Sequence, residues 1–299
     1  MRVLMFGWEF PPHITGGLGT ACFGLTKGLV KHGIGVTFVV PKAFGDETKE
    51  GFRLVNASDI VLDMEQHETR LFLEKIQYME IGSNLVPYLD PEEFEIAVTA
   101  QKLEESSEHK IFSKQYTFSG KYGPNLMEEV SRYALVATSL ASANDFDVIH
   151  AHDWLTYPAG IAARNQSGKP LVIHVHATEF DRSGGNVNPV VYAIEREGME
   201  QADHIIAVSN LTRNTVIEKY GIDPGKVTTV YNAVEPISEE EKKVIKKGIT
   251  GRIVTFLGRI TYQKGPEFFV EAAGLVLSKM KDVRFVMAGS GDMMDAMVE

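Results

Sequence analysis

Cysteine is nearly absent from this sequence, since Cys22 is the only one among 299 residues. No intrachain disulfide can therefore form, and nothing supports an oxidising compartment. Long hydrophobic runs are missing too: no segment approaches the length of a membrane span, and the N-terminus lacks a basic flank followed by a long apolar stretch. These absences predict a cytoplasmic protein with no integral membrane segment.

Positive charge is scarce as well. The chain carries 30 Lys and Arg against 40 Asp and Glu, a formal net charge of -10, and it has no long basic run. A nucleic-acid surface needs clustered cations, so we expect no nucleic-acid partner, whereas a glycan or a nucleotide remains open. At 44% hydrophobic residues the chain can bury a large core, and its length favours two domains over one.

The first 33 residues predict a strand, a tight loop and a helix. The apolar run Val3–Phe6 is followed by Gly16 and Gly17, which open a helix that is capped by Gly33. Glycines here let the backbone approach a ligand, and the free N–H groups of the first helical turn then face an anion. We therefore expect a phosphate site in this loop. The helix face expected to pack on a sheet consists of Leu18, Cys22, Leu25 and Leu29.

A dinucleotide fingerprint is the main rival interpretation of this loop. The segment Gly17–Cys22 supplies two glycines and fails at the third, and the second strand, Gly35–Val40, ends in Pro41-Lys42 without a carboxylate for a ribose. Both departures argue against a nicotinamide or flavin site. A glycine turn that only lets the helix pack closely is the other alternative.

Residues 43–126 break the regular pattern, and short runs such as Ile60–Leu62 and Leu85–Tyr88 predict an insertion of short strands and loops. Beyond it, helices alternate with strands, which predicts an α/β fold with a doubly wound parallel sheet covered on both faces. The expected helices are 126–143, 157–166, 190–201 and 211–220, and the expected strands are 148–152, 171–177, 204–208 and 227–231.

Polar residues gather where the predicted strands end. These residues are Glu9, His152, Asp153, His176, Ser209 and Asn232. Open parallel sheets bind ligands outside the carboxyl ends of their strands, so we expect these residues to converge on one crevice. Glu9, Ser209 and Asn232 would serve equally well as strand-end caps.

Two motifs raise the question of a metal ion. The pairs His150-x-His152 and His174-x-His176 suggest zinc, but no supporting cysteine or carboxylate arrangement accompanies them, so we expect hydrogen-bonded buried histidines and no metal. Asp145-x-Asp147 is a spacing that metal-dependent sugar transferases use. It precedes a strand, which puts it at the amino edge of the sheet, opposite the crevice.

The composition shifts abruptly in residues 236–250, as expected of a linker between domains. A second strand-helix-strand unit follows, with strands at 252–257 and 283–288 and a helix whose packed face holds Phe268, Phe269, Ala272, Ala273 and Val276. Arg259 and Lys264 lie in the loop after its first strand, where two cations facing a crevice suit a diphosphate. Two solvated basic residues beside a turn are the alternative.

In this order the motifs resemble those of GT-B glycosyltransferases, above all the glycogen and starch synthases and related retaining nucleotide-sugar transferases, over nearly the whole chain. Trp8–Pro12 with Thr15–Leu18 resembles their opening motif, with Ile14 in place of its lysine. The other three matching segments are His150–Trp154 for their His-Asp-Trp strand, Val175-His176 for their Val-His element and Gly258–Gly265 for their Arg-x-x-x-x-Lys-Gly loop.

The resemblance implies a metal-independent hexosyltransferase of carbohydrate biosynthesis. It would move a sugar, glucose by family precedent, from ADP- or UDP-glucose to a hydroxyl of an acceptor such as an α-glucan, with retention and without a cofactor. Asp153 and His176 would contact the sugar, and Gly16, Gly17, Arg259 and Lys264 would hold the diphosphate. Glu9, His152, Ser209 and Asn232 are candidates for the sugar or acceptor side. A GT-B epimerase and a non-catalytic sugar-nucleotide or glycan-binding module remain alternatives, and a dehydrogenase is disfavoured by the failed fingerprint.

The resemblance also divides the chain into an acceptor-side domain at 1–235, a linker at 236–250 and the start of a donor domain at 251–299. A complete donor domain needs well over 100 residues, and the family's Glu-x7-Glu motif does not occur in this segment. We therefore expect a truncated donor domain and little transferase activity from these 299 residues alone.

Overall fold

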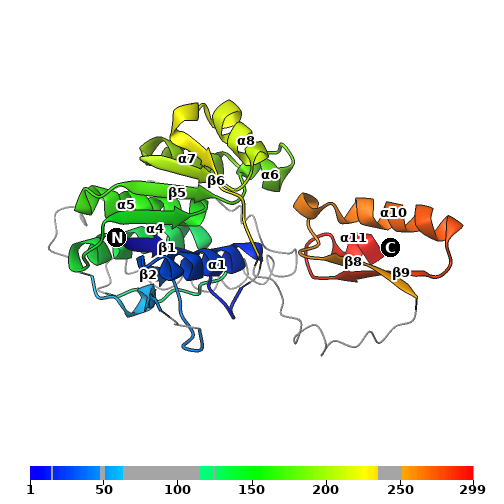
Figure 1. The fold of residues 1–299 in the computed structure, drawn as a ribbon, viewed down its shortest axis with the longest axis horizontal. Helices are drawn as coiled ribbons and strands as arrows, with labels where there is room; N and C mark the ends of the chain where they lie inside the picture. Colours follow the sequence, from blue (N-terminus) through cyan, green and yellow to red (C-terminus); the bar gives the residue numbers. More distant parts are fainter. Residues whose placement is uncertain (15, 48–50, 63–114, 124, 235–250, 299) are drawn as a thin grey trace, which may run out of the picture.

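A computed structural model describes residues 1–14, 16–47, 51–62, 115–123, 125–234 and 251–298. Its largest element is a seven-stranded parallel sheet with the strand order β3-β2-β1-β4-β5-β6-β7 (Figure 1). The strands are β1 (Arg2–Phe6), β2 (Gly35–Val40), β3 (Arg53–Asn56), β4 (Val148–His152), β5 (Leu171–Val175), β6 (His204–Ala207) and β7 (Val227–Thr229). The predicted doubly wound α/β fold is confirmed.

The sheet is buried on both faces, and the sequence of β1 shows why. Leu4 and Phe6 belong to one hydrophobic cluster, whereas Val3 and Met5 belong to a second one. Because alternate residues of a strand point to opposite faces, the two clusters lie on opposite sides of the sheet. After Arg2 every residue of β1 is apolar and buried, as expected for a strand of a parallel sheet that helices cover on both faces.

Helices supply the covering layers. Helix α1 (Gly17–Lys31) buries Gly19, Cys22 and Thr26, while the other members of its predicted stripe are partly buried around the second cluster. The other helices among the described residues of this domain are α4 (Leu126–Ala143), α5 (Tyr157–Ser167), α6 (Glu179–Ser183), α7 (Pro189–Gln201) and α8 (Asn210–Tyr220), with short 3-10 turns η1 (Ala57–Asp59), η2 (Trp154–Thr156) and η3 (Pro224–Lys226).

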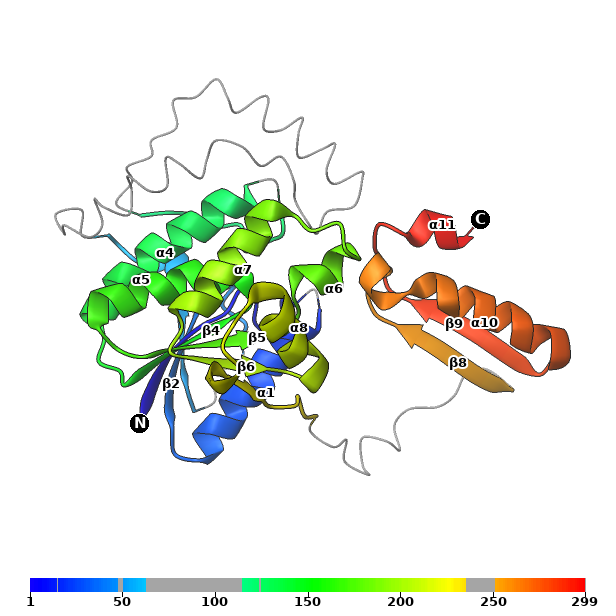
Figure 2. The ribbon, with the colours of Figure 1, turned by 90° about the horizontal axis from the view of Figure 1, so that it is seen from above.

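A second, smaller unit follows residue 250, as predicted. Its parallel strands β8 (Arg252–Leu257) and β9 (Val283–Ala288) pair with each other, and the unit also contains η4 (Tyr262–Lys264), α10 (Pro266–Lys279) and α11 (Met294–Val298). Phe269 packs its ring 5.6 Å from those of Phe256 and Phe285. Phe268 is 68% exposed and Ala272 is exposed too, so the packed face of α10 is narrower than predicted. Figure 2 shows this unit beside α6.

The predicted insertion needs one correction. Arg53–Asn56 is a short strand, but it belongs to the main sheet and not to an insertion: it is the edge strand β3, paired in parallel with β2. Four residues are too few for a periodic pattern, which is why the sequence did not reveal this strand. Ile60–Leu62 is not a strand, and Leu85–Tyr88 lies outside the described residues.

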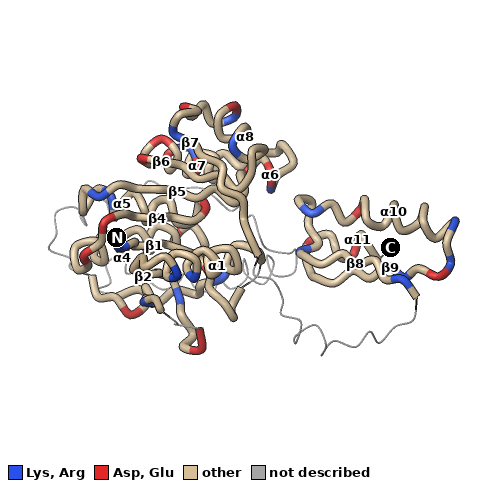
Figure 3. The backbone as a smooth tube through the Cα atoms, in the orientation of Figure 1, with Lys and Arg blue, Asp and Glu red and all other residues tan. Residues whose placement is uncertain are grey.

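Basic and acidic residues are interspersed over the described chain (Figure 3). Asp145 and Asp147 lie at the amino edge of the sheet, where both carboxylates contact Arg2 at the start of β1. Their predicted position away from the crevice is confirmed. None of the described helices is long and apolar enough to cross a lipid bilayer.

Candidate active site

The carboxyl ends of β1, β4 and β5 meet at one edge of the sheet. Phe6 is in register with Ala151, and His152 with His174. The segments that follow these strands bring Glu9, Asp153 and His176 to the same edge, as predicted from the chain order. Glu9 is 6% exposed, and its carboxylate accepts the backbone N–H of Gly19 at 3.4 Å.

Asp153 has the most unusual backbone of the site, with φ 59° and ψ 168°. This region is populated almost only by glycine, so a side chain there is strained. Its Oδ1 accepts the backbone N–H of His176 at 2.8 Å and that of Ala177 at 3.4 Å. Burial raises the pKa of this carboxyl to about 6, opposed by the positive charge of Arg182 and by the two N–H donors. The sheet edge therefore holds one carboxylate rigidly beside His176.

Four histidines of β4 and β5 form a packed cluster. His150 and His152 lie with ring centroids 4.3 Å apart, and His174 and His176 with centroids 4.4 Å apart. Nδ1 of His152 is 3.0 Å from Nε2 of His176. Burial lowers the pKa of His176 to about 4 and that of His174 to about 3, and it lowers those of the other two well below the ordinary value. All four imidazoles are therefore neutral at pH 7.

The glycine loop leaves the N-terminus of α1 accessible. Gly16 is its N-cap residue, and a Cβ placed on Gly16 or Gly17 would meet no atom within 4 Å. Gly19 differs, because a Cβ there would lie 2.3 Å from Ile14. Close packing thus explains Gly19, whereas Gly16 and Gly17 border open space in which an anion can approach the N–H groups.

Arg259 and Lys264 belong to the smaller unit, and their assignment as a diphosphate clamp stays a prediction. Lys264 is exposed and Arg259 is half-buried. The turn η4, which contains Lys264, contacts α6, the helix that begins three residues after His176. At this contact a Cβ on Gly184 would lie 2.2 Å from the ring of Tyr262.

Ser209 and Asn232 have different surroundings. The Ser209 hydroxyl accepts the backbone N–H of Thr212 at 3.0 Å, so Ser209 is the N-cap of α8, the alternative left open for it. Asn232 is exposed and lines a cavity of about 450 Å³ that is bordered by α1, His174 and the segment after β7. Asn232 remains a candidate for the acceptor side.

A buried ion-pair network behind the site was not predicted. The Arg182 guanidinium contacts the carboxylates of Glu179 and Glu195 and donates to the Ala177 carbonyl at 3.1 Å. The hydroxyl of Tyr220 also donates to Glu195. The detectable signal was Thr178-x-x-Asp181, a capping box whose hydrogen bonds the structure contains. This network fixes the segment that follows His176.

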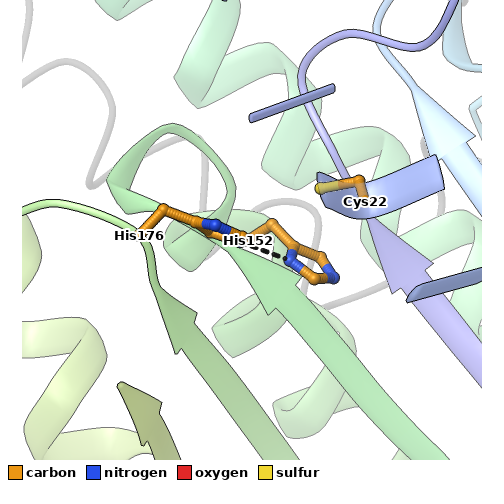
Figure 4. A group of neighbouring side chains, drawn as sticks. All are labelled: Cys22, His152 and His176. Carbon is orange, nitrogen blue, oxygen red and sulfur yellow. Dashed lines mark hydrogen bonds between the residues drawn. The ribbon is translucent and has the colours of Figure 1, made fainter. Parts of the chain in front are cut away.

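Three groups of side chains among the described residues are close enough to share a metal ion. Two of them draw on the histidine cluster: Cys22 with His152 and His176, and His150 with His152 and His174. The third, His13 with Asp46 and Glu47, lies on a surface loop. Figure 4 shows the first group, in which Cys22 and the two hydrogen-bonded histidines come from three separate elements. The sequence could not reveal it because Cys22 belongs to a helix 130 residues away from His152.

The chain is similar in sequence to known glycosyltransferases. The model of Glycosyltransferase Family 4 matches residues 83–237. An uncharacterised glycosyltransferase of Methanocaldococcus jannaschii is 27% identical over 99% of this chain and 64% of its own length. A glycogen synthase of Mycobacterium tuberculosis is 23% identical over 100% of this chain and 64% of its own length. The chain thus spans slightly less than two thirds of these relatives.

Solved structures show the same fold. Sucrose-phosphate synthase of Thermosynechococcus elongatus superposes with a TM-score of 0.61 at 12% identity, over 97% of this chain and 62% of that protein. An Anabaena protein, HepE, solved in complex with UDP and glucose, superposes with a TM-score of 0.55 at 13% identity, over 100% of this chain and 64% of its own. These similarities support the predicted GT-B arrangement.

Proposed function

Because this chain belongs to Glycosyltransferase Family 4 and has a GT-B fold, we propose that it contributes the acceptor side and part of the donor side of a sugar-transfer site. The reaction moves glucose from a nucleoside diphosphate glucose to an acceptor hydroxyl, with retention at the anomeric carbon. The observation that carries the proposal is the strained Asp153, whose carboxylate is fixed beside His176 at the edge where α1 presents its open N-terminus.

The difficult step in this reaction is departure of the diphosphate, because negative charge grows on its oxygens. Preorganised donors stabilise such charge best when they are already in place. The N–H groups at Gly16 and Gly17 would supply one set, and Arg259 and Lys264 the other. No divalent metal is required for this stabilisation.

Asp153 and His176 would orient the sugar. His176 is neutral at pH 7, so its ring does not act as a cation. It can donate a hydrogen bond to a sugar hydroxyl or accept one from it. Asp153 is mostly ionised above pH 6 and can accept hydrogen bonds from hydroxyl groups with its second oxygen. We assign neither residue as a covalent nucleophile.

UDP-glucose is the first donor to test, since the HepE structure holds UDP and glucose, and ADP-glucose is the second. An α-glucan is the first acceptor, because a glycogen synthase is among the relatives. A ligand at a hundred times its Kd stabilises the folded state by about 2.7 kcal/mol, so a thermal-shift screen detects binding directly. We expect UDP or ADP to raise the Tm, with CMP and inorganic phosphate as weaker comparators.

Turnover assays separate the three candidate functions. Release of nucleoside diphosphate that depends on an acceptor, with an α-linked product by NMR, supports a retaining transferase. Sugar isomerisation without acceptor supports a GT-B epimerase. Binding without either reaction supports a non-catalytic sugar-nucleotide module only when the chain assayed carries a complete donor domain, because we expect little turnover from these 299 residues alone. If no nucleoside diphosphate raises the Tm, the proposed donor site is wrong.

A further inference from the structure

Three side chains from separate elements converge beside the candidate sugar site. Cys22 comes from α1, His152 from the end of β4 and His176 from the segment after β5. One ligand atom from each lies within 4.8 Å of those of the other two, and all three side chains are buried or nearly so. The nitrogens of the two imidazoles are only 3.0 Å apart (Figure 4).

In the metal-free structure these two nitrogens share a hydrogen bond, and their separation is also close to that of two ligands around one small cation. Two imidazole nitrogens bound to a tetrahedral Zn2+ lie about 3.3 Å apart, given Zn–N bonds of about 2.05 Å. The measured pair needs almost no change to reach that separation, and Sγ of Cys22 lies within 4.8 Å of a ring nitrogen of each histidine. One thiolate and two imidazoles are a donor set that Zn2+ prefers, with the fourth position left to water.

The protonation states also suit a metal ion. Burial keeps both imidazoles neutral, which is the form that binds metals. The carboxylates of Asp153 and Glu9 place negative potential at Cys22, which favours a cation there.

The histidine cluster has unused hydrogen-bonding capacity as well. Nε2 of His152, Nε2 of His150 and both ring nitrogens of His174 are buried without a hydrogen-bond partner in the described structure. Buried polar atoms are usually satisfied, so a group of orphaned ones calls for a ligand or a function. His174 also borders the 450 Å³ cavity beside α1, which gives an ion a route toward the cluster.

We propose that Cys22, His152 and His176 form a reversible binding site for a divalent transition-metal ion of the Zn2+ type. The site is inhibitory, a consequence that rests on the proposed function: an ion held by His176 withdraws this imidazole from the sugar. Metal and donor sugar should then exclude each other, although donor binding itself needs no metal.

The test uses Co2+ with the wild-type chain. Cobalt bound to a thiolate gives a near-ultraviolet charge-transfer absorption, and Cys22 is the only cysteine that can produce it. We expect the absorption to saturate at one Co2+ per chain and to disappear when Zn2+ is added, since Zn2+ binds such sites more tightly than Co2+. Absence of the absorption in the folded protein would overturn the site. This outcome does not depend on activity, so it is distinguishable from failure of the proposed function.

Variants identify the other two ligands. His176→Gln and His152→Gln should each weaken Co2+ binding by at least about a hundredfold, since even loss of a residue behind a metal ligand costs 10- to 100-fold. His204→Gln is the matched control, because His204 lies on the neighbouring strand β6 outside the cluster. An unchanged cobalt spectrum in both cluster variants would show that Cys22 binds metal without them and would overturn the proposal. Asp46→Asn should leave the spectrum unchanged, which separates this site from the surface group at His13.

Discussion

The side chain of Asp153 accepts the backbone N–H of His176 at 2.8 Å and so joins the ends of two neighbouring strands. Both residues follow a strand whose carboxyl end lies at the crevice. In this arrangement Asp153 has a backbone conformation that residues other than glycine rarely adopt.

Substitution of Asp153 should separate this strain from the hydrogen bonds. Both Asp153→Ala and Asp153→Gly remove the acceptor, but only glycine relieves the backbone at φ 59°. We expect the glycine variant to be more stable than the alanine variant by about 1–3 kcal/mol in urea unfolding. At Asp147, where φ is not positive, the same two substitutions should show the reverse order. If the two variants at position 153 are equally stable, the backbone of Asp153 is not strained.

The diphosphate clamp predicts a loss of affinity on removal of either cation. Each charge-assisted hydrogen bond contributes about 1.5–3 kcal/mol, so Arg259→Ala or Lys264→Ala should weaken nucleoside diphosphate binding about tenfold or more. Lys279→Ala, at the exposed end of α10, should leave the affinity unchanged. Calorimetric titration measures all three, and wild-type affinity in both loop variants would eliminate the clamp.

The open space at Gly17 predicts a substitution that affects binding more than folding. A Cβ at position 17 meets no protein atom, so Gly17→Val should change the free energy of unfolding by no more than about 1 kcal/mol. The added side chain would occupy the approach to the N-terminus of α1, and we expect at least a tenfold loss of nucleoside diphosphate affinity. Gly24→Val, in equally open space on the same helix, is the control. If both variants bind the nucleotide equally well, the anion is held elsewhere.

Chelation should leave donor binding intact. The acidic pair Asp145-x-Asp147 lies at the amino edge with Arg2, and the proposed donors for the diphosphate are N–H groups and fixed cations. We expect the Kd for UDP to be the same with and without EDTA in calorimetric titration. A loss of binding that Mg2+ or Mn2+ restores would require a metal site within the donor pocket.

The raised pKa of Glu195 predicts that the contribution of this residue to the free energy of unfolding declines as the pH rises. Burial raises its pKa to about 7, more than the charge of Arg182 lowers it, so the folded protein holds this proton more tightly than the unfolded chain. Its contribution is complete below pH 4.5 and is lost as the pH rises through 7. From about 1.4 kcal/mol per pKa unit, the loss is on the order of 3 kcal/mol.

The buried histidines have lowered pKa values and give the opposite slope, so the measurement is the difference between wild type and Glu195→Gln. Urea unfolding at pH 5 and 7.5 should show the variant losing less stability, or gaining more, than the wild type. Glu197→Gln, exposed on the same helix, should follow the wild type. Parallel pH profiles for wild type and Glu195→Gln would contradict the raised pKa.

The sequence predicted those parts of the molecule that depend on local pattern and chain order. Buried strands such as Val148–His152 could be identified from the sequence, and the carboxyl-edge rule then placed Asp153 and His176 at the same edge of the sheet. Their direct contact was not predicted. β3 was missed because four residues carry no period.

Residues that act through packing could not be found in this way. Cys22 was predicted only as a core residue, since its contact with His152 depends on how α1 crosses the sheet. The contact of Arg182 with Glu195 likewise depends on how α6 and α7 pack, whereas its partner Glu179 lies three residues earlier in the same helix. For Ser209 the sequence supported two roles equally, and only the geometry of its hydroxyl selected the helix cap.

Residue 184 is a glycine and so has no Cβ atom. A methyl group there would overlap the ring of Tyr262, so the contact between the turn that carries Lys264 and the helix after His176 can keep its present geometry only with glycine at this position. Gly184 therefore allows α6 and the turn η4 to approach each other closely. A larger residue at position 184 would push the turn that carries Lys264 away from α6. Such a variant changes none of the residues proposed to bind the ligand.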